Sequence, residues 1–256
     1  MKILLLNSIL LLSSFLTLGQ ETYYNQIFRS AVKLMDDNKV NGSGVFVRKN
    51  NSHYLITALH VIKNSSVLHL SYLGTNLERN YCQINLDSVE IRTNISKDLV
   101  AIRIGERIDE NHVRISTQMH CNGLDVQMFP LDVNGFFKGD NQELLGRRIL
   151  VPGYPTNVFN SYIDRTKPLL RNGIIAGLGT NESLIIDAPV YGGNSGGPIY
   201  VDIGDDTSTR FVFVGIAIQY SFGLNKIPTK DDSFDNSGLG VIITSKDIAQ
   251  LISIEN

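Results

Sequence analysis

Short runs of β-branched, aromatic and other apolar residues, separated by polar or glycine-containing turns, recur along most of this 256-residue chain. The clearest runs cover residues 45–47, 54–57, 67–72, 83–86, 89–92, 99–104, 148–151, 173–177, 184–187, 198–201, 211–216 and 240–243. One clear helical pattern follows them, with Ser245 as the expected N-cap and Ile248, Leu251 and Ile252 on one face. So many short strands with so few helices predict an all-β barrel or sandwich.

The first residues have the pattern of a secretory signal peptide. Lys2 is followed by an apolar run to Leu18 that polar residues interrupt, and the run is too short for a good membrane span. We expect cleavage after Gly19, with an uncleaved anchor as the alternative. The mature chain, residues 20–256, is then expected to be secreted or periplasmic, with no stable membrane span.

The composition narrows the expected partners. The 23 basic and 25 acidic side chains give a net charge of −2, and no basic stripe points to nucleic acid. Cys82 and Cys121 are the two cysteines, and in an exported chain they permit one disulfide. Two separately buried thiols are an equally good alternative. No cysteine or histidine spacing indicates a metal site or a cofactor.

One stretch, Gly192-Gly193-Asn194-Ser195-Gly196-Gly197-Pro198, places a serine between two pairs of glycines. Glycine is expected where the backbone needs a positive φ or where another group comes very close. Such a turn can expose a hydroxyl and direct backbone N–H groups to one point beside it, which acyl transfer requires. A glycine-rich hairpin without catalytic function is the alternative. The catalytic interpretation needs a base and a carboxylate elsewhere.

His60 and Asp98 are the candidates for those two roles. His60 follows the predicted strand at residues 54–57, and Asp98 directly precedes the strand at residues 99–104. Histidine can take the serine proton near neutral pH, and a carboxylate can hold the imidazole in one tautomer and orientation. Taken alone, Asp98 fits a turn or capping residue better than a catalytic carboxylate. Together the residues occur in the order His, Asp, Ser, with the serine in the other half of the chain.

At this point the sequence resembles a family. Residues 57–61 (Thr-Ala-Leu-His-Val), 97–101 (Lys-Asp-Leu-Val-Ala) and 193–198 (Gly-Asn-Ser-Gly-Gly-Pro) look like the signature blocks of trypsin-like, chymotrypsin-fold serine proteases. The bacterial HtrA/DegP and V8-like branches are the most similar. Residues 153–155, 172–177, 187–188 and 238–243 also fit that branch. The resemblance extends from about Gly42 to the C-terminus, and no PDZ domain is expected.

The resemblance implies two six-stranded antiparallel Greek-key barrels and a short C-terminal helix. Residues 20–135 would form the first barrel, with His60 and Asp98, and residues 136–256 the second, with Ser195. The backbone N–H groups of Gly193 and Ser195 would form the oxyanion hole. The implied function is a serine endopeptidase that cleaves peptide or protein substrates through an acyl-enzyme, without a metal or cofactor.

The resemblance also suggests a substrate-binding pocket. Its walls would be Pro189, Val190 and Tyr191 on one side and Ile218, Gln219 and Tyr220 on the other. Asp187 lies too far before Ser195 to select Lys or Arg, and the absence of histidine from residues 216–221 argues against Glu selection. We therefore expect cleavage after small or apolar residues, with Tyr220 partly closing the pocket.

Two rival functions remain open. A catalytically silent pseudoprotease would keep the barrels and act as a binding module with a blocked pocket. An esterase would use the same three residues on an ester. Asn194 carries one more expectation. In the digestive branch an aspartate here pairs with a newly cut N-terminus, which asparagine cannot do, so activity should not depend on an activating cut.

Overall fold

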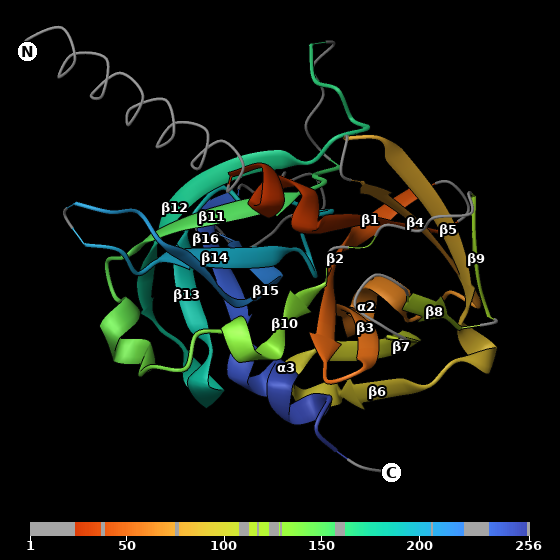
Figure 1. Cartoon of the computed structure of the whole chain (residues 1–256). Helices are drawn as coiled ribbons and strands as arrows, with labels where there is room; N and C mark the ends of the chain where they lie inside the picture. The colour runs from red at the N-terminus through yellow and green to blue at the C-terminus, as the bar shows by residue number, and fades with distance from the viewer. Residues whose placement is uncertain are drawn as a thin grey trace, which may run out of the picture.

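The computed structural model of the chain (Figure 1) describes residues 24–36, 39–74, 77–107, 113–116, 118–122, 128, 130–156, 162–205, 207–222 and 236–254. Side chains are described for all of these except residues 113, 114, 219–222, 236 and 237. The predicted signal peptide lies outside these ranges. Within them, no helix has the length and apolar character that crossing a membrane requires.

The first half of the chain forms one curled sheet of ten strands. The main path runs in the order β6-β7-β3-β2-β1-β4-β5-β9, with β8 paired to β7 and β10 paired to β2. The strands are β1 (Ala31–Asp36), β2 (Lys39–Lys49), β3 (Ser52–Ala58), β4 (Val67–Leu73), β5 (Arg79–Asn85), β6 (Ile91–Asn94), β7 (Leu99–Arg107), β8 (Val113–Ile115), β9 (Met119–Cys121) and β10 (Leu131–Asp132).

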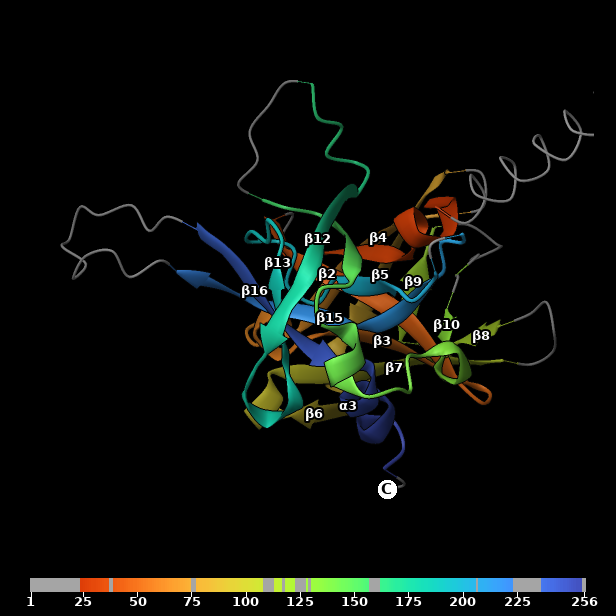
Figure 2. The ribbon, with the colours of Figure 1, turned by 90° about the vertical axis from the view of Figure 1, so that its left-hand side faces the viewer.

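The second half forms a closed barrel of six strands in the order β11-β12-β13-β16-β15-β14. Figure 1 shows this barrel beside the first sheet, and Figure 2 shows β12, β13 and β16 facing the viewer. The strands are β11 (Arg148–Gly153), β12 (Leu169–Leu178), β13 (Leu184–Asp187), β14 (Pro198–Asp202), β15 (Phe211–Phe222) and β16 (Asn236–Thr244). The predicted all-β architecture is confirmed.

Helical segments are short. Residues 24–30 form a helix, and the others are α2 (Leu59–Ile62), α3 (Ser245–Leu251), η1 (Leu86–Ser88), η2 (Ile95–Lys97), η3 (Val133–Gly135), η4 (Asn141–Leu144) and η5 (Thr180–Glu182). The predicted apolar face of α3 is confirmed, since Ile248, Leu251 and Ile252 are buried. The predicted N-cap is wrong by one residue: Ser245 is already helical, and Thr244, whose backbone is extended, is the cap. Ser245 Oγ donates to the Phe137 carbonyl at 3.3 Å instead.

Three apolar clusters hold the molecule together. One lies inside the first sheet and one inside the barrel. The third joins the two halves: Val45 and Leu99 of the first sheet lie in one cluster with Phe213 and Ile216 of β15 and Ile248 of α3. Burial of so much apolar surface between the halves fixes their relative position, on which any site between them depends.

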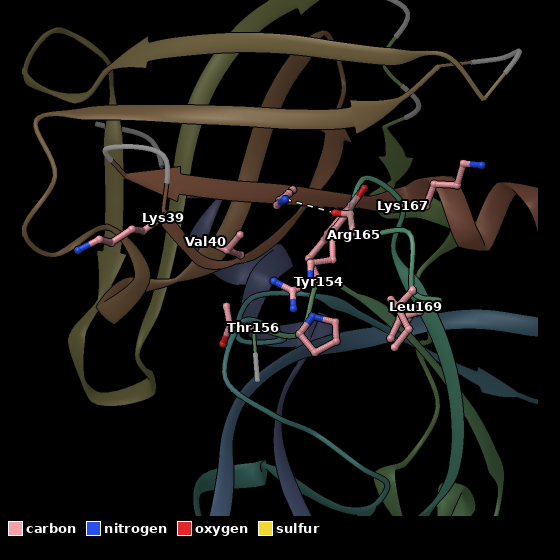
Figure 3. A pocket seen from close by; sticks show the side chains of 10 residues that line it. Lys39, Val40, Tyr154, Thr156, Arg165, Lys167 and Leu169 are labelled. Atoms are coloured by element: carbon pink, nitrogen blue, oxygen red, sulfur yellow. Dashed lines mark hydrogen bonds between the residues drawn. The ribbon is translucent and has the colours of Figure 1, made fainter. Parts of the chain in front are cut away.

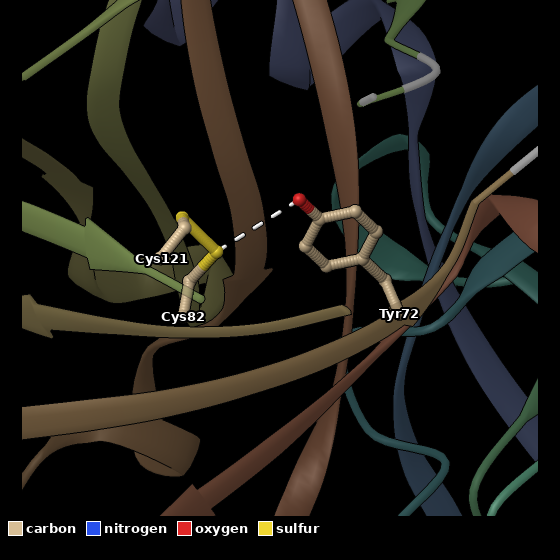
Figure 4. Close-up of a disulfide and its surroundings, with 3 residues drawn as sticks. All are labelled: Tyr72, Cys82 and Cys121. Atoms are coloured by element: carbon tan, nitrogen blue, oxygen red, sulfur yellow. Dashed lines mark hydrogen bonds between the residues drawn. A yellow bond between two sulfur atoms is a disulfide. The ribbon is translucent and has the colours of Figure 1, made fainter. Parts of the chain in front are cut away.

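Cys82 and Cys121 form a disulfide, which decides between the two alternatives that the sequence left open. They lie opposite each other in the antiparallel pairing of β5 with β9. Figure 4 shows the bond beside the Tyr72 hydroxyl, which lies 3.8 Å from Cys82 Sγ. The bond closes a chain segment of 39 residues. It therefore ties the edge strand β9 to the first sheet.

We expect reduction of this disulfide to lower the free energy of unfolding by about 4 kcal/mol, because it releases a long closed loop in the unfolded chain. For a protein of this size the melting temperature should fall by about 10 °C on addition of dithiothreitol. The Cys82→Ala/Cys121→Ala variant is the control, since dithiothreitol should not change its melting temperature. An unchanged melting temperature in the reduced native protein would contradict the prediction.

Candidate active site

Asp98 holds His60 at two points. Asp98 Oδ1 accepts a hydrogen bond from the His60 backbone N–H at 2.9 Å, and Asp98 Oδ2 lies 2.5 Å from His60 Nδ1. An ionised carboxylate only accepts hydrogen bonds, so Nδ1 carries the imidazole proton in this contact. Nε2 then has a free lone pair. The two residues that the sequence singled out 38 positions apart are in direct contact.

The backbone brings Asp98 to this position by a left-handed turn. Strand β3 ends at Ala58, α2 follows at once, and Leu59 N–H donates to the Asp98 carbonyl at 2.9 Å. Asp98 itself caps η2 with φ 50° and ψ 41°. Among non-glycine residues, aspartate and asparagine tolerate this region best. Asp98 is therefore a capping residue, and its carboxylate also contacts the His60 ring.

Lys97 anchors the Asp98 turn to the second half of the chain. Its Nζ lies 2.5 Å from Asp247 Oδ1 in α3 and 3.0 Å from the Asn181 carbonyl. The two charged side chains are 18% and 6% exposed, so the ion pair is largely shielded from water. Thr244 Oγ1 donates to the other Asp247 oxygen at 2.8 Å. Nothing in the sequence indicates this contact, because Lys97 and Asp247 are 150 residues apart.

The Ser195 turn needs glycine at the positions where the sequence has it. Gly193 and Gly196 have φ values of +90° and +83°. A Cβ at Gly193 would lie 2.3 Å from the Tyr154 carbonyl oxygen, and one at Gly196 would lie 2.1 Å from the Ser43 carbonyl oxygen. Both the conformation and the close approach exclude other residues. The turn is thus pressed against two other segments, one from each half of the chain.

Ser43 in β2 connects the turn to the first sheet. Its N–H donates to the Ser195 carbonyl at 2.8 Å, and its Oγ donates to the Gly193 carbonyl at 2.7 Å. Ser43 Oγ also accepts from Tyr154 N–H at 3.1 Å, and the Ser43 carbonyl accepts from Thr57 Oγ1 at 2.7 Å. Ser43 is fully buried. The sequence analysis missed this residue, although its place between Gly42 and Gly44 was a usable signal of close packing.

Thr156 fixes the peptide between Gly192 and Gly193. The Gly192 carbonyl accepts from Thr156 N–H at 2.7 Å and from Thr156 Oγ1 at 3.0 Å. In a trans peptide the N–H points opposite to the C=O. The Gly193 N–H is therefore directed away from Thr156. Sequence analysis also missed Thr156, which follows the recognised Gly-Tyr-Pro stretch by one position.

Two backbone donors of the turn have no acceptor. Within the described part of the chain, the N–H groups of Gly193 and Ser195 donate no hydrogen bond, whereas those of Asn194, Gly196 and Gly197 each do. Both residues are buried, with Ser195 8% exposed. Buried backbone donors are nearly always paired, so an unpaired couple beside one serine requires an explanation. An anion placed there would satisfy both.

His60 and Ser195 come to the same region without a direct bond. Among the residues that the structure describes, no hydrogen bond joins the His60 ring to the Ser195 hydroxyl. The turn nevertheless packs on the segment that leads to His60, since a Cβ at Gly196 would lie 3.0 Å from Ala58 N. In unliganded sites such a catalytic hydrogen bond is often long and tightens when substrate binds.

The six residues expected to line the substrate pocket differ in how far they are exposed. Pro189 is exposed and Tyr191 half-buried, whereas the Val190 side chain lies in the apolar cluster of the barrel. Ile218 is half-buried and packs against the cluster that joins the two halves and against the cluster of the first sheet. The side chains of Gln219 and Tyr220 lie outside the described residues, and with them the expected closure by Tyr220.

Arg171 adds a positive charge to one of these expected walls. Its guanidinium lies 4.6 Å from the centre of the Tyr191 ring and donates to the Pro189 carbonyl at 2.5 Å. Partial burial lowers the Arg171 pKa, and Tyr191 acts in the opposite direction. No group of three or more metal-binding side chains occurs in the part of the chain that the structure covers.

Comparison with protein families gives one match. A model of the trypsin-like peptidase domain matches residues 42–205, which contain His60, Asp98 and Ser195. No curated protein matches the chain in sequence.

Several solved structures resemble the fold. The MamO protease domain from Magnetospirillum magneticum has a TM-score of 0.55 at 16% identity, covering 91% of this chain and 100% of that one. A serine endoprotease from Yersinia pestis has a TM-score of 0.52 at 18% identity, covering 90% of this chain and 65% of that one. The HtrA-type protease AlgW, solved with a tripeptide, has a TM-score of 0.55 at 16% identity, with 90% and 62% covered. The chain thus spans less than two thirds of the length of these last two proteins.

Lys97→Met should lower the free energy of unfolding by about 3 kcal/mol, because it leaves the buried Asp247 carboxylate without its cation. Denaturant unfolding measures this difference. Lys246→Met is the matched control, since Lys246, the neighbour of Asp247 in α3, forms an exposed pair with Glu182 of η5 that should contribute less than about 1 kcal/mol. Similar losses in the two variants would contradict a special role for Lys97.

Proposed function

Because the chain belongs to the family of trypsin-like peptidase domains, we propose that it is a serine endopeptidase that uses Ser195, His60 and Asp98. The observation that carries this proposal is the pair of unpaired amides, Gly193 N–H and Ser195 N–H, beside a serine in a glycine turn. The two-point contact of Asp98 with His60 supports it, since it leaves His60 Nε2 available as a base.

The chemistry follows from these groups. Ser195 Oγ attacks the carbonyl carbon of the substrate while His60 Nε2 takes the hydroxyl proton, and Asp98 stabilises the imidazolium that forms. The carbonyl oxygen becomes an oxyanion that accepts from Gly193 and Ser195 N–H. The C–N bond then breaks, and His60 gives its proton to the leaving amine. Water then attacks the acyl-enzyme while His60 Nε2 takes one of its protons. The bond to Ser195 Oγ breaks, His60 returns the proton to Ser195, and the acid is released.

We propose cleavage after small or apolar residues. Arg171 beside Tyr191 places a cation at the expected wall, which disfavours a substrate lysine or arginine there. Asp187, the acidic residue before Ser195 that could attract a basic substrate side chain, is exposed at the end of β13, eight residues before the serine. We also propose export, directed by residues 1–19. The disulfide supports this location, because such bonds persist mainly in oxidising compartments.

Labelling with a fluorophosphonate probe tests the nucleophile. The native protein should be labelled, Ser195→Ala should lose all labelling, and Asp98→Asn should slow labelling by about 10³-fold or more, because the imidazole then adopts the wrong tautomer. Absence of labelling in the folded native protein would favour the pseudoprotease. A labelled protein that hydrolyses simple esters but no peptide in a random library would be an esterase instead.

Thr156→Val tests the role of the Gly192 carbonyl contact. The change removes one of two hydrogen bonds that orient the Gly193 N–H, so kcat should fall about 5–10-fold with little change in KM. Affinity for a peptidyl boronate, which forms the tetrahedral adduct, should fall by the same factor. Thr156→Ser keeps the hydroxyl and should restore both values. A change in KM alone would show that Thr156 acts only in substrate binding.

A further inference from the structure

A basic pocket lies beside the Ser195 turn. It is a cavity of about 330 Å³, and its lining includes four cationic residues, Lys33, Lys39, Arg165 and Lys167, together with Tyr154 and Thr156. Among the residues that the structure describes, no acidic side chain lines it, although Asp164 Oδ2 lies 3.5 Å from Lys167 Nζ. In Figure 3 Lys39 and Lys167 extend outward at its two ends, with Tyr154, Thr156 and Arg165 between them. The pocket therefore has a positive interior and charged edges.

Lys33 is the least solvated of these cations. Its Nζ donates to the Arg165 carbonyl at 3.3 Å and lies 5.8 Å from the centre of the Tyr154 ring. Partial burial lowers the Lys33 pKa, and the charges of Arg79 and Arg165 lower it further. A cation that is poorly hydrated and surrounded by like charge gains most when an anion enters. The pocket is thus suited to a negatively charged ligand.

The pocket adjoins the catalytic turn on the β2 side. Thr156 lines the pocket and also holds the Gly192 carbonyl. Val40 lines it two residues before Gly42, where a Cβ would lie 2.8 Å from the Ser195 carbonyl oxygen. The other side of the turn faces β15, where Gly196 N–H donates to the Ala217 carbonyl at 2.5 Å. The expected wall for the residue before the cut bond begins there, at Ile218.

A substrate whose residues before the cut bond lie on the β15 side of Ser195 therefore extends toward the basic pocket with the residues that follow the cut bond. We propose that this pocket binds the carboxylate of an acidic side chain within the first few residues after the cut bond. Arginine and lysine bind a carboxylate by charge-assisted hydrogen bonds, and an arginine fork can do so with two bonds. The inference rests on the proposed function for the direction of the substrate.

Binding can be measured without turnover. Dye-labelled pentapeptides with a free amino terminus, carrying Asp in turn at each of the first three positions, represent the leaving segment, and Asn versions are the matched controls. On Ser195→Ala, we expect one Asp peptide to bind at least about 10-fold more tightly than its Asn counterpart in fluorescence anisotropy. Lys33→Met and Arg165→Gln, each added to Ser195→Ala, should abolish that preference. Lys246→Gln, which changes a distant exposed lysine, should keep it.

Kinetics then test selectivity in the active protein. Quenched fluorogenic peptides with the same residues before the cut, and Asp or Asn at the preferred position after it, should differ at least about 10-fold in kcat/KM. In the Arg165→Glu variant, a peptide with Lys at the preferred position should be cleaved with a higher kcat/KM than the Asp peptide, because the substitution replaces a positive charge of the pocket by a negative one. Moving the Asp to the other side of the cut bond should remove the effect.

The outcomes separate the two proposals. Equal binding of Asp and Asn peptides at every position would overturn the pocket assignment, even if the neutral peptide is cleaved and the probe labels Ser195. A rise in melting temperature with inorganic phosphate, without tighter binding of the Asp peptides, would overturn the assignment too. The pocket would then bind small anions only. A third outcome is that the probe does not label the native protein and no peptide is cleaved, while the Asp peptide still binds more tightly than the Asn peptide. This outcome would refute the endopeptidase and leave the pocket as a carboxylate site.

Discussion

The hydrogen bonds of Ser43 are the contact on which the rest of the site depends. A single buried residue of the first sheet binds the carbonyls of Gly193 and Ser195 and the N–H of Tyr154, which all belong to the second half of the chain. The peptides that carry the two unpaired N–H groups are held by other contacts: the Gly192 carbonyl accepts from Thr156, and the Asn194 carbonyl accepts from Gly197 N–H at 2.9 Å. Ser43 holds the next peptide after each of these two, so the oxyanion hole that we propose also depends on how the two halves are joined.

Two further contacts make that joint rigid. The apolar cluster between the sheets contains residues of β2, β7, β15 and α3, and the Lys97–Asp247 pair crosses the same boundary next to Asp98. Apolar burial supplies most of the attraction, whereas the ion pair is specific to one position. The positions of His60 and Asp98 relative to Ser195 therefore depend on contacts made by neighbouring residues, in addition to the Ser43 hydrogen bonds.

The sequence predicted what depends on local pattern and missed what depends on distant partners. The strands follow from runs of apolar residues, and the glycines of the turn follow from its steric demands at Gly193 and Gly196. Lys97 and Thr156 look ordinary in sequence, and the glycines on either side of Ser43 indicate close packing but not its partners, because all three roles arise only when chain segments 36 to 150 residues apart meet. The disulfide was undecided for the same reason: the pairing of β5 with β9 is a long-range property.

The segment from Tyr154 to Thr156 links the two sites that we infer. On one side it fixes the Gly192 carbonyl, and on the other it lines the basic pocket. Binding energy accelerates a reaction only where it is greater in the transition state than in the ground state. An acidic side chain held in the pocket would contact the segment whose Thr156 orients Gly193 N–H, so its contribution should appear partly in kcat. A specificity pocket that acted by affinity alone would change KM and leave kcat as it was.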